Sequence, residues 1–244
     1  MSNALVRRSI FAAVLAFASG CSPRDPAVLS MPPDDTPASG GLAAADMGAP
    51  PPPTTLPPMP NPITQENAQP GDPSWPLAPP APKHALEGYG SRITVHPGDA
   101  VAVAVNVSQA QPVSWRVYRI GWYGGAGARL VQSGGPVAVA PQPACPRDPT
   151  TSRVECAWAV AFTVATAADA LSGAYVIKLH GNAGESYVPF VVQDGRAATI
   201  LVNANVTSWQ AYNDWDGESL YADASGTMPH QKAWEVSYDR PFAN

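Results

Sequence analysis

The distribution of proline divides this chain of 244 residues into a part that cannot form a core and a part that can. Of the 29 prolines, 19 lie between Ser22 and Ala85, together with eight charged residues and a single aromatic residue, Trp75. Runs such as Pro50 to Pro53 favour extended polyproline conformations. We therefore expect residues 21–85 to be a disordered, semi-rigid tether and the folded part to begin near residue 86.

The first 20 residues have the pattern of a bacterial secretion signal. Arg7 and Arg8 precede an apolar run at residues 10–17, which is too short to span a bilayer. The small residues 18–20 come directly before Cys21, as in lipoproteins, although Ala18 stands where leucine is usual. We expect Cys21 to be acylated and to anchor the chain in the cell envelope, at the outer membrane or cell surface. Ordinary cleavage, with Cys21 left as a free thiol, is the alternative.

The charge of the chain bears on its partners. The formal net charge is −5, and removal of Arg7 and Arg8 with the signal makes it −5 − 2 = −7. An acidic protein is a poor candidate to bind nucleic acid or anionic lipid headgroups, so the expected partner is membrane lipid through the acylated Cys21, as the signal pattern implies. The four histidines are scattered without the spacing of metal ligands. We therefore expect no histidine-based metal site and no cofactor in this chain as given.

Residues 86–194 read as an Ig-like antiparallel β-sandwich. Short β-branched stretches alternate with Gly, Pro, Asn and Asp, and no long helical period interrupts them. The clearest stretch is A-V-A-V-A-V-N-V, which has a period of two. The predicted strands are Ala100–Val107, Ser114–Ile120, Val137–Ala140, Ala157–Val164, Ala174–His180 and Ser186–Val192.

Cys145 and Cys156 are the remaining cysteines, and both belong to the exported part of the chain. Exported cysteine pairs usually form disulfides. Such a bond would close a polar loop that has no core of its own. Reactive or metal-binding thiols are the alternative, but no third ligand lies nearby in the sequence.

The glycine-rich stretch at 121–129, G-W-Y-G-G-A-G-A-R, has two interpretations. It has the composition of a phosphate-binding loop, but it does not lead from a strand into a helix with the spacing of nucleotide motifs. A wide turn between two strands, with Trp122 and Tyr123 packed beside it, fits better.

A second kind of structure is predicted after residue 195. Thr199–Val202 is a short apolar, β-branched run, as expected of a strand covered on both faces in an α/β sheet. Ligands in such sheets bind beyond the carboxyl end of the strand. The polar and aromatic residues that follow are therefore candidates to line a site; they include Asn205, Trp209, Asn213 and Trp215.

Seven segments together resemble the family built around the large (beta) subunit of N,N-dimethylformamidase, in the form found in exported bacterial proteins. The resemblance covers residues 86–244. The matching segments are L-E-G-Y-G-S-R-I-T-V-H-P-G-D (86–99), V-Y-R-I-G-W-Y-G-G-A-G-A-R (117–129), C-A-W (156–158), S-G-A-Y-V-I-K-L (172–179), S-Y-V-P-F-V-V (186–192), S-W-Q-A-Y-N-D-W-D-G-E-S-L-Y (208–221) and V-S-Y-D-R-P (236–241).

The resemblance implies a β-sandwich followed by a flavodoxin-like, amidotransferase-like α/β domain that hydrolyses an amide C–N bond. It also implies a mononuclear iron held by two tyrosines and a glutamate, of which Tyr212 would be the first ligand. The other two ligands would lie beyond Asn244. Asp216 stands where the family usually has glycine. Packing of Tyr212 at the edge of the sheet is the alternative to metal binding.

We therefore expect residues 195–244 to be the N-terminal fragment of that α/β domain, poorly ordered, leaning on the sandwich, or prone to aggregate. Whether the chain is an enzyme is left open, and the fragment is expected to be inactive. The leading alternative is a non-catalytic module that binds glycan or protein through aromatics such as Trp122, Tyr123 and Trp158. A third hypothesis is a subunit whose Tyr212 joins a site completed by a separate chain or by a missing α/β domain.

Overall fold

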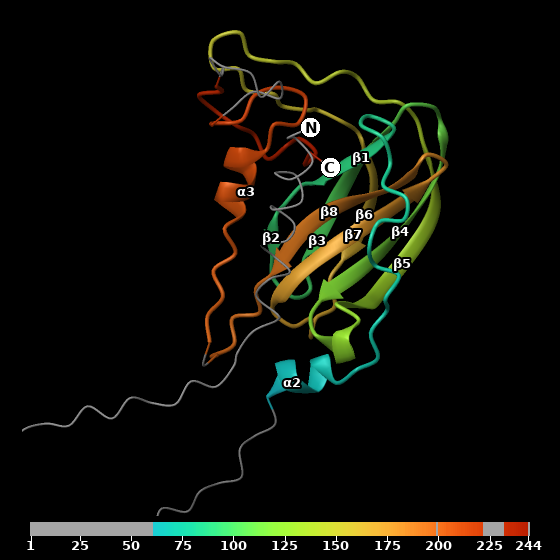
Figure 1. Cartoon of the computed structure of the whole chain (residues 1–244), viewed down its shortest axis with the longest axis vertical. Coiled ribbons are helices and arrows are strands. Elements are labelled where there is room, and N and C mark those ends of the chain that lie inside the picture. The colour runs from blue at the N-terminus through green and yellow to red at the C-terminus, as the bar shows by residue number, and fades with distance from the viewer. Residues whose placement is uncertain (1–60, 199, 222–231, 244) are drawn as a thin grey trace, which may run out of the picture.

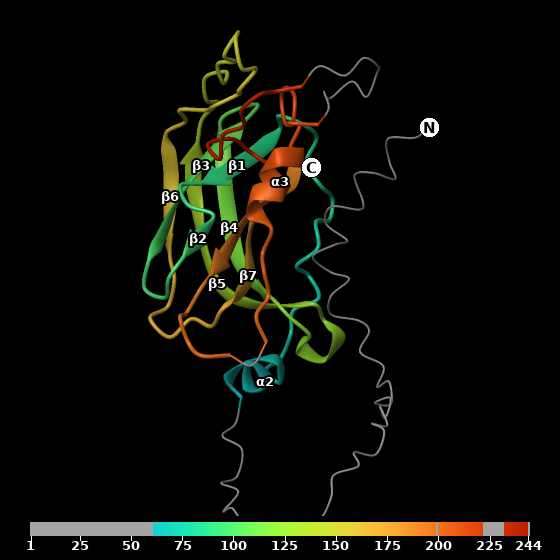
Figure 2. The ribbon, with the colours of Figure 1, turned by 90° about the vertical axis from the view of Figure 1, so that its left-hand side faces the viewer.

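The computed structural model describes residues 61–198, 200–221 and 232–243, so the predicted signal, Cys21 and most of the predicted tether lie outside the described residues. Two β-sheets form a sandwich (Figures 1 and 2), with strand orders β1-β3-β6 and β2-β8-β7-β4-β5. The prediction of a mainly β fold is confirmed. The elements are α2 (Pro62–Asn67), β1 (Leu86–Gly90), β2 (Thr94–Val95), β3 (Ala100–Val107), β4 (Gln111–Ile120), the 3-10 helix η2 (Tyr123–Gly125), β5 (Ala128–Val139), β6 (Val160–Ala165), β7 (Gly173–Gly181), β8 (Gly184–Val192) and α3 (Val206–Tyr212).

The core between the sheets follows from the period of two in β3. Val101, Val103, Val105 and Val107 are fully buried, while the intervening residues face the other side of the sheet. Burying each valine side chain contributes roughly 1.5 to 3 kcal/mol. These four residues therefore fix which face of the smaller sheet meets the larger one.

The six strands predicted within residues 86–194 are all present, most with shifted ends, but β1, β2 and most of β5 were not predicted. β5 contains Gly134, Gly135 and Pro136, which are unfavourable in a central strand. It lies at the edge of its sheet, where proline is tolerated. A Cβ at Gly134 would lie 2.3 Å from the ring of Trp115, so close packing against the tryptophan requires glycine there.

The glycine-rich stretch forms the turn between β4 and β5, as the second of its two interpretations predicts. Gly124 has φ 66° and Gly125 has φ 96°, which are left-handed conformations that favour glycine. Tyr123 is buried, whereas the side chain of Trp122 is 58% exposed. None of the helices in the described part of the chain is long and apolar enough to cross a membrane.

Residues 61–85, called the strap below, differ from the predicted tether because they pack on the sandwich. The strap runs from α2 at one end of the sandwich to the start of β1 at the other (Figure 1). The amide of Ala81 donates to the carbonyl of Glu185 at 2.8 Å, and Trp75 stacks on Tyr187 with ring centroids 6.4 Å apart. The strap has no core of its own, and it is ordered by the surface of the larger sheet.

A buried ion pair holds the middle of the strap. Lys178 in β7 lies 2.8 Å from Glu185 in β8, and both side chains are almost fully buried. The Lys178 ammonium also donates to the carbonyls of Ser74 and Pro76, at 2.7 and 2.9 Å. Glu185 accepts the amide proton of Ala78 at 2.7 Å. Two charges of the sheet thus satisfy backbone groups of a segment that forms few hydrogen bonds of its own.

A second ion pair holds α2. Glu66 accepts hydrogen bonds from Arg129 at 2.7 Å and from the hydroxyl of Tyr123 at 2.8 Å. Burial raises the pKa of Glu66, but these two hydrogen bonds and the charge of Arg129 outweigh it and hold the pKa below the ordinary value of 4.5. The pKa of Glu185 is lowered in the same way: burial raises it, but the hydrogen bonds from Lys178 and the amide of Ala78, together with the nearby positive charge, outweigh the burial.

The strand expected at Thr199–Val202 is not formed. Thr199 lies outside the described residues, and residues 200–202 have no strand partner. Ile200, Leu201 and Val202 are 79%, 93% and 81% exposed. A strand needs a neighbour to satisfy its backbone groups, and no described segment pairs with this run. The described residues after 205, which are 206–221 and 232–243, lean on the sandwich, which is one of the outcomes expected for residues 195–244.

The strap should be released by acid. Because the pKa values of Glu66 and Glu185 are lowered by folding, both carboxylates stabilise the docked strap above about pH 4.5, and this stabilisation is lost as the pH falls through the lowered values. We expect the free energy of unfolding, measured in urea, to decrease between pH 5 and pH 3. The double variant Glu66→Gln, Glu185→Gln should be less stable at pH 6 and should have a flatter pH profile. If the free energy of unfolding of that variant still decreases as steeply between pH 5 and pH 3, other carboxylates cause the pH dependence.

Candidate functional site

The candidate site residues lie in the C-terminal segment, residues 205–221 and 232–243, which covers one end of the sandwich beside the loop that joins β5 to β6 (Figure 2). The segment contains the short helix α3 and two stretches without regular structure. It is held by buried polar contacts and by one tryptophan, and these contacts decide which of its side chains remain free.

Asn213, which ends α3, is the polar centre of the segment. Its side-chain amide donates to the carbonyl of Pro241 at 2.8 Å, and its side-chain oxygen accepts the amide protons of Trp215 and Ala243 at 3.2 and 3.0 Å. The guanidinium of Arg240 donates to the carbonyl of Asn213 at 2.6 Å. These contacts tie the two described parts of the segment together at the end of α3.

Arg240 is the most deeply buried charge of the segment, with 0% of its surface exposed. Burial lowers the pKa of Arg240 to about 10, against the opposing charge of Asp214, so the side chain is still protonated at neutral pH. Next to it, the side chain of Gln210 on α3 donates to the carbonyl of Ser237. The inner face of α3 is therefore fixed by groups that lie at least 27 residues away in the sequence.

Trp215 inserts into an aromatic cluster on the sandwich and is only 3% exposed. Its ring meets Trp158 edge to face with centroids 5.8 Å apart, Tyr89 packs in the same cluster, and His84 lies 5.8 Å away on the strap side. The indole N–H donates to the carboxylate of Glu87 at 3.0 Å. Trp215 therefore joins the C-terminal segment to β1 by both apolar packing and a charged hydrogen bond.

Glu87 is the acceptor on which this joint depends, and it is only 3% exposed. The same oxygen that binds Trp215 accepts the backbone amide proton of His84 at 2.8 Å. The imidazole of His84 lies 3.2 Å from the other oxygen of Glu87 and 3.4 Å from Asp216. The end of the strap, β1 and the C-terminal segment thus meet at one buried carboxylate.

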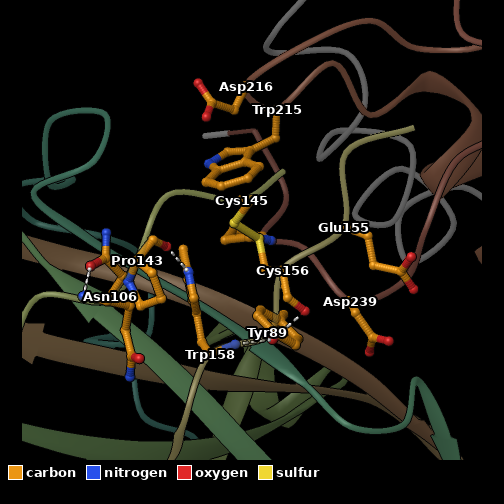
Figure 3. The surroundings of a disulfide bond; sticks show 12 residues. Tyr89, Asn106, Pro143, Cys145, Glu155, Cys156, Trp158, Trp215, Asp216 and Asp239 are labelled. Carbon is orange, nitrogen blue, oxygen red and sulfur yellow. Dashed lines mark hydrogen bonds between the residues drawn. A yellow bond between two sulfur atoms is a disulfide. The ribbon is translucent and has the colours of Figure 1, made fainter. Parts of the chain in front are cut away.

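The predicted disulfide between Cys145 and Cys156 is confirmed, and it lies directly beneath Trp215 (Figure 3). The bond closes the disulfide loop, residues 145–156. Within the loop, the amide of Asp148 donates to the carbonyl of Arg153 at 2.9 Å. The disulfide therefore shapes a loop outside the sheets, and the underside of the C-terminal segment rests on it.

Tyr212, the metal ligand implied by the resemblance, points away from these contacts. It is 53% exposed, and its ring stacks on Tyr221 with centroids 4.3 Å apart and an interplanar angle of 14°. No described residue makes a hydrogen bond to its hydroxyl. The phenol oxygen is therefore available to solvent or to another group.

The other predicted site-lining residues do not converge on one cavity. Asn213 and Trp215 are buried and hold the segment in place. Asn205 is exposed at the start of α3, where its side chain makes no capping bond, and Trp209 is half-buried on the helix. Two of the four predicted residues, Asn213 and Trp215, thus support the backbone and do not line a binding surface.

The resemblance assigns one ligand of an iron site, Tyr212, to this chain. The described residues contain no group of three His, Cys, Asp or Glu side chains arranged to hold a metal ion. Tyr212 offers one hard oxygen donor, beside a second phenol that is stacked on it. A ferric centre with an oxygen-rich shell needs a carboxylate as well.

The aromatic residues expected for glycan binding are not gathered into an exposed row. Tyr123 and Trp158 are 3% and 8% exposed, and both pack inward. Of these three residues Trp122 is the exposed one, beside a shallow hollow of about 650 Å³ between α2 and η2. The three residues therefore do not form the stacking platform that the hypothesis of a binding module proposed for them.

Sequence reasoning did not identify Glu87 or Arg240 as important residues. For Glu87 a signal was present, because a carboxylate in the otherwise apolar strand β1 must find a buried partner. For Arg240 there was no such signal, since its acceptor is a backbone carbonyl. Glu87 acts in the joint between the segment and the sandwich, whereas Arg240 ties the two described parts of the segment together.

Trp215→Ala should detach the C-terminal segment. Removal of a buried tryptophan costs about 3 to 5 kcal/mol, and this change also leaves Glu87 buried without the indole donor. We expect rapid cleavage of the segment in limited proteolysis and a lower free energy of unfolding. Trp234→Ala is the matched control, because Trp234 lies in the same segment but is 83% exposed; it should change the stability by less than about 0.5 kcal/mol. Equal effects of the two variants would contradict the anchoring role of Trp215.

Comparison with known proteins agrees with the resemblance found in the sequence. The family model described as N,N-dimethylformamidase beta subunit-like, C-terminal, matches residues 114–244, from β4 through the whole C-terminal segment. No curated protein matches the chain. The matched region is more than half of the 244 residues and contains the disulfide, Trp215 and Tyr212. The chain therefore belongs to the N,N-dimethylformamidase beta subunit-like family.

Proposed function

We propose that this chain is the scaffold of an amide hydrolase, in which the sandwich holds the C-terminal segment and presents Tyr212 to a site for iron-dependent C–N bond hydrolysis. The carboxylate and the second phenolate of that site come from a domain or partner outside the described residues. The observation that carries the proposal is the contrast between Tyr212, which is half exposed, and its neighbours Asn213 and Trp215, which are buried and fixed.

The support for this role is geometric. A metal ligand must be held within a fraction of an ångström, which requires a backbone fixed by surrounding contacts. On one side of Tyr212, Gln210 is bonded to Ser237, and on the other side Asn213 is bonded to Pro241. The ring itself is restrained by Tyr221. A phenolate oxygen on such a backbone is a suitable donor to a hard metal ion.

We expect that the chain by itself does not hydrolyse amides, because the proposal places the carboxylate and the second phenolate of the site on a domain or partner outside the described residues. We expect the purified chain, incubated with ferric or ferrous iron and desalted, to retain less than one iron per chain. We also expect it to release no dimethylamine from N,N-dimethylformamide above the buffer rate. Turnover with bound iron that is lost in Tyr212→Phe and kept in Tyr221→Phe would contradict the division of the site between this chain and another part.

We further propose that the protein is anchored in the cell envelope by lipid on Cys21. The support is the order of basic, apolar and small residues before Cys21, together with the disulfide, which forms and persists in oxidising compartments outside the cytoplasm. The proline-rich residues 22–60 would then separate the strap and the sandwich from the membrane surface.

Cys21→Ser should release the protein from the membrane. Without the thiol no acyl chain can be attached, so we expect the variant to move to the soluble fraction and to lose labelling by a radioactive fatty acid. Ser22→Ala is the control and should remain in the membrane fraction. Membrane association that persists in Cys21→Ser would show that the attachment does not depend on this cysteine.

A further inference from the structure

The disulfide loop makes contacts with both described parts of the C-terminal segment, and these contacts are polar and spread along its length. They comprise two ion pairs, two backbone hydrogen bonds and one side-chain hydrogen bond. They are Arg147 with Glu218, Arg153 with Glu235 at 2.7 Å, the amide of Trp234 with the carbonyl of Thr151 at 2.8 Å, the amide of Cys156 with the carbonyl of Asp239 at 2.7 Å, and Ser237 with Glu155 at 3.3 Å.

The loop also contributes apolar surface to the same joint. Val154 is 1% exposed, and a Cβ at Gly217 would lie 2.9 Å from its side chain, so the segment approaches the loop closely there. Cys145 and Cys156 pack in one cluster with Trp215. The cluster between the two sheets contains no residue of the disulfide loop. The loop therefore supports the C-terminal segment and is separate from the main core of the sandwich.

We propose that the Cys145–Cys156 disulfide is a redox-sensitive clamp: oxidised, it holds the loop in the shape that docks the C-terminal segment, and reduced, it releases the segment while the sandwich stays folded. Only one consequence of the inference rests on the proposed function: release of the C-terminal segment would also withdraw Tyr212 from its site. The docking itself follows from the contacts.

The physical reason is the chain entropy of the loop. The bond restrains the ten residues between the two cysteines, and reduction gives them back conformational freedom. Five different residues of the loop contact the segment. All five contacts can form together only when the whole loop adopts one conformation. The remaining bonds within the loop are local, such as Thr151 to Asp148 at 2.8 Å, and they constrain only its turn.

The step is a thiol–disulfide exchange with a dithiol as reductant. Its thiolate attacks the sulfur of Cys145, which is partly exposed, whereas Cys156 is buried. The S–S bond breaks, and the Cys156 thiolate leaves and takes up a proton. The second thiol of the reductant then displaces Cys145 and forms the cyclic disulfide of the reductant. In sum, two electrons and two protons pass to the protein and leave two cysteine thiols.

Hydrogen exchange of single amides, with and without dithiothreitol, tests the clamp in the folded wild-type protein. We expect exchange at Cys156 and Trp234 to accelerate by roughly tenfold or more on reduction, because their amide protons are bonded across the joint. Exchange at Val117 and Ile177, which are paired between β4 and β7, should not change. Reoxidation should restore the slow rates.

The double variant Cys145→Ser, Cys156→Ser gives an independent measurement. It should show the fast exchange without dithiothreitol and no further change when the reductant is added. Slow exchange at Cys156 and Trp234 in the reduced wild type would overturn the proposal. So would acceleration at Val117 and Ile177 to the same extent, because the disulfide would then maintain the whole sandwich.

The outcome is independent of the proposed catalytic role. The exchange measurement uses neither iron nor amide substrate, and Tyr212→Phe should leave all the measured rates unchanged. Amide hydrolysis by the chain alone would refute the proposed function without affecting the clamp. Failure of the clamp would likewise leave open how Tyr212 is used.

Discussion

The hydrogen bond from the indole of Trp215 to the carboxylate of Glu87 is the contact on which the arrangement of this protein depends. A buried carboxylate is costly unless it is bonded, and Glu87 is satisfied only when the C-terminal segment and the end of the strap are both in place. The same tryptophan packs over the disulfide and meets Trp158 edge to face. One side chain thus couples β1, the disulfide loop and the segment that bears Tyr212.

The buried charges of the molecule lie mainly at its joints. Lys178 and Glu185 hold the strap, while Glu87 and Arg240 hold the C-terminal segment. Apolar residues fill the space between the sheets, so the sandwich does not need these charges for its own core. Buried ionic groups stabilise weakly on balance, but they penalise every arrangement in which their partners are missing. They therefore give the two added segments a defined position without enlarging the core.

The sequence predicted the sandwich well and the added segments poorly, for one physical reason. The alternation in β3 is a local pattern, because successive side chains of a strand point to opposite faces of the sheet. The buried valines of Ala100–Val107 could therefore be predicted from the sequence. The strap has the composition of a disordered tether, and the surface of the larger sheet orders it, through contacts such as Ala81 with Glu185. Conversely, the run of Ile200 to Val202 has strand propensity but no neighbour, and propensity alone does not form a strand.

By itself, the sequence determined the β-sandwich, the pairing of Cys145 with Cys156, the family, and the segment that carries Tyr212, because each of these depends on residue type and spacing. Only the tertiary structure decided what the residues of that segment do. Asn213 and Trp215 are polar and aromatic, as site residues are, yet packing turns them inward as anchors and leaves Tyr212 outside. That choice depends on contacts between residues up to 128 positions apart, which no local pattern encodes.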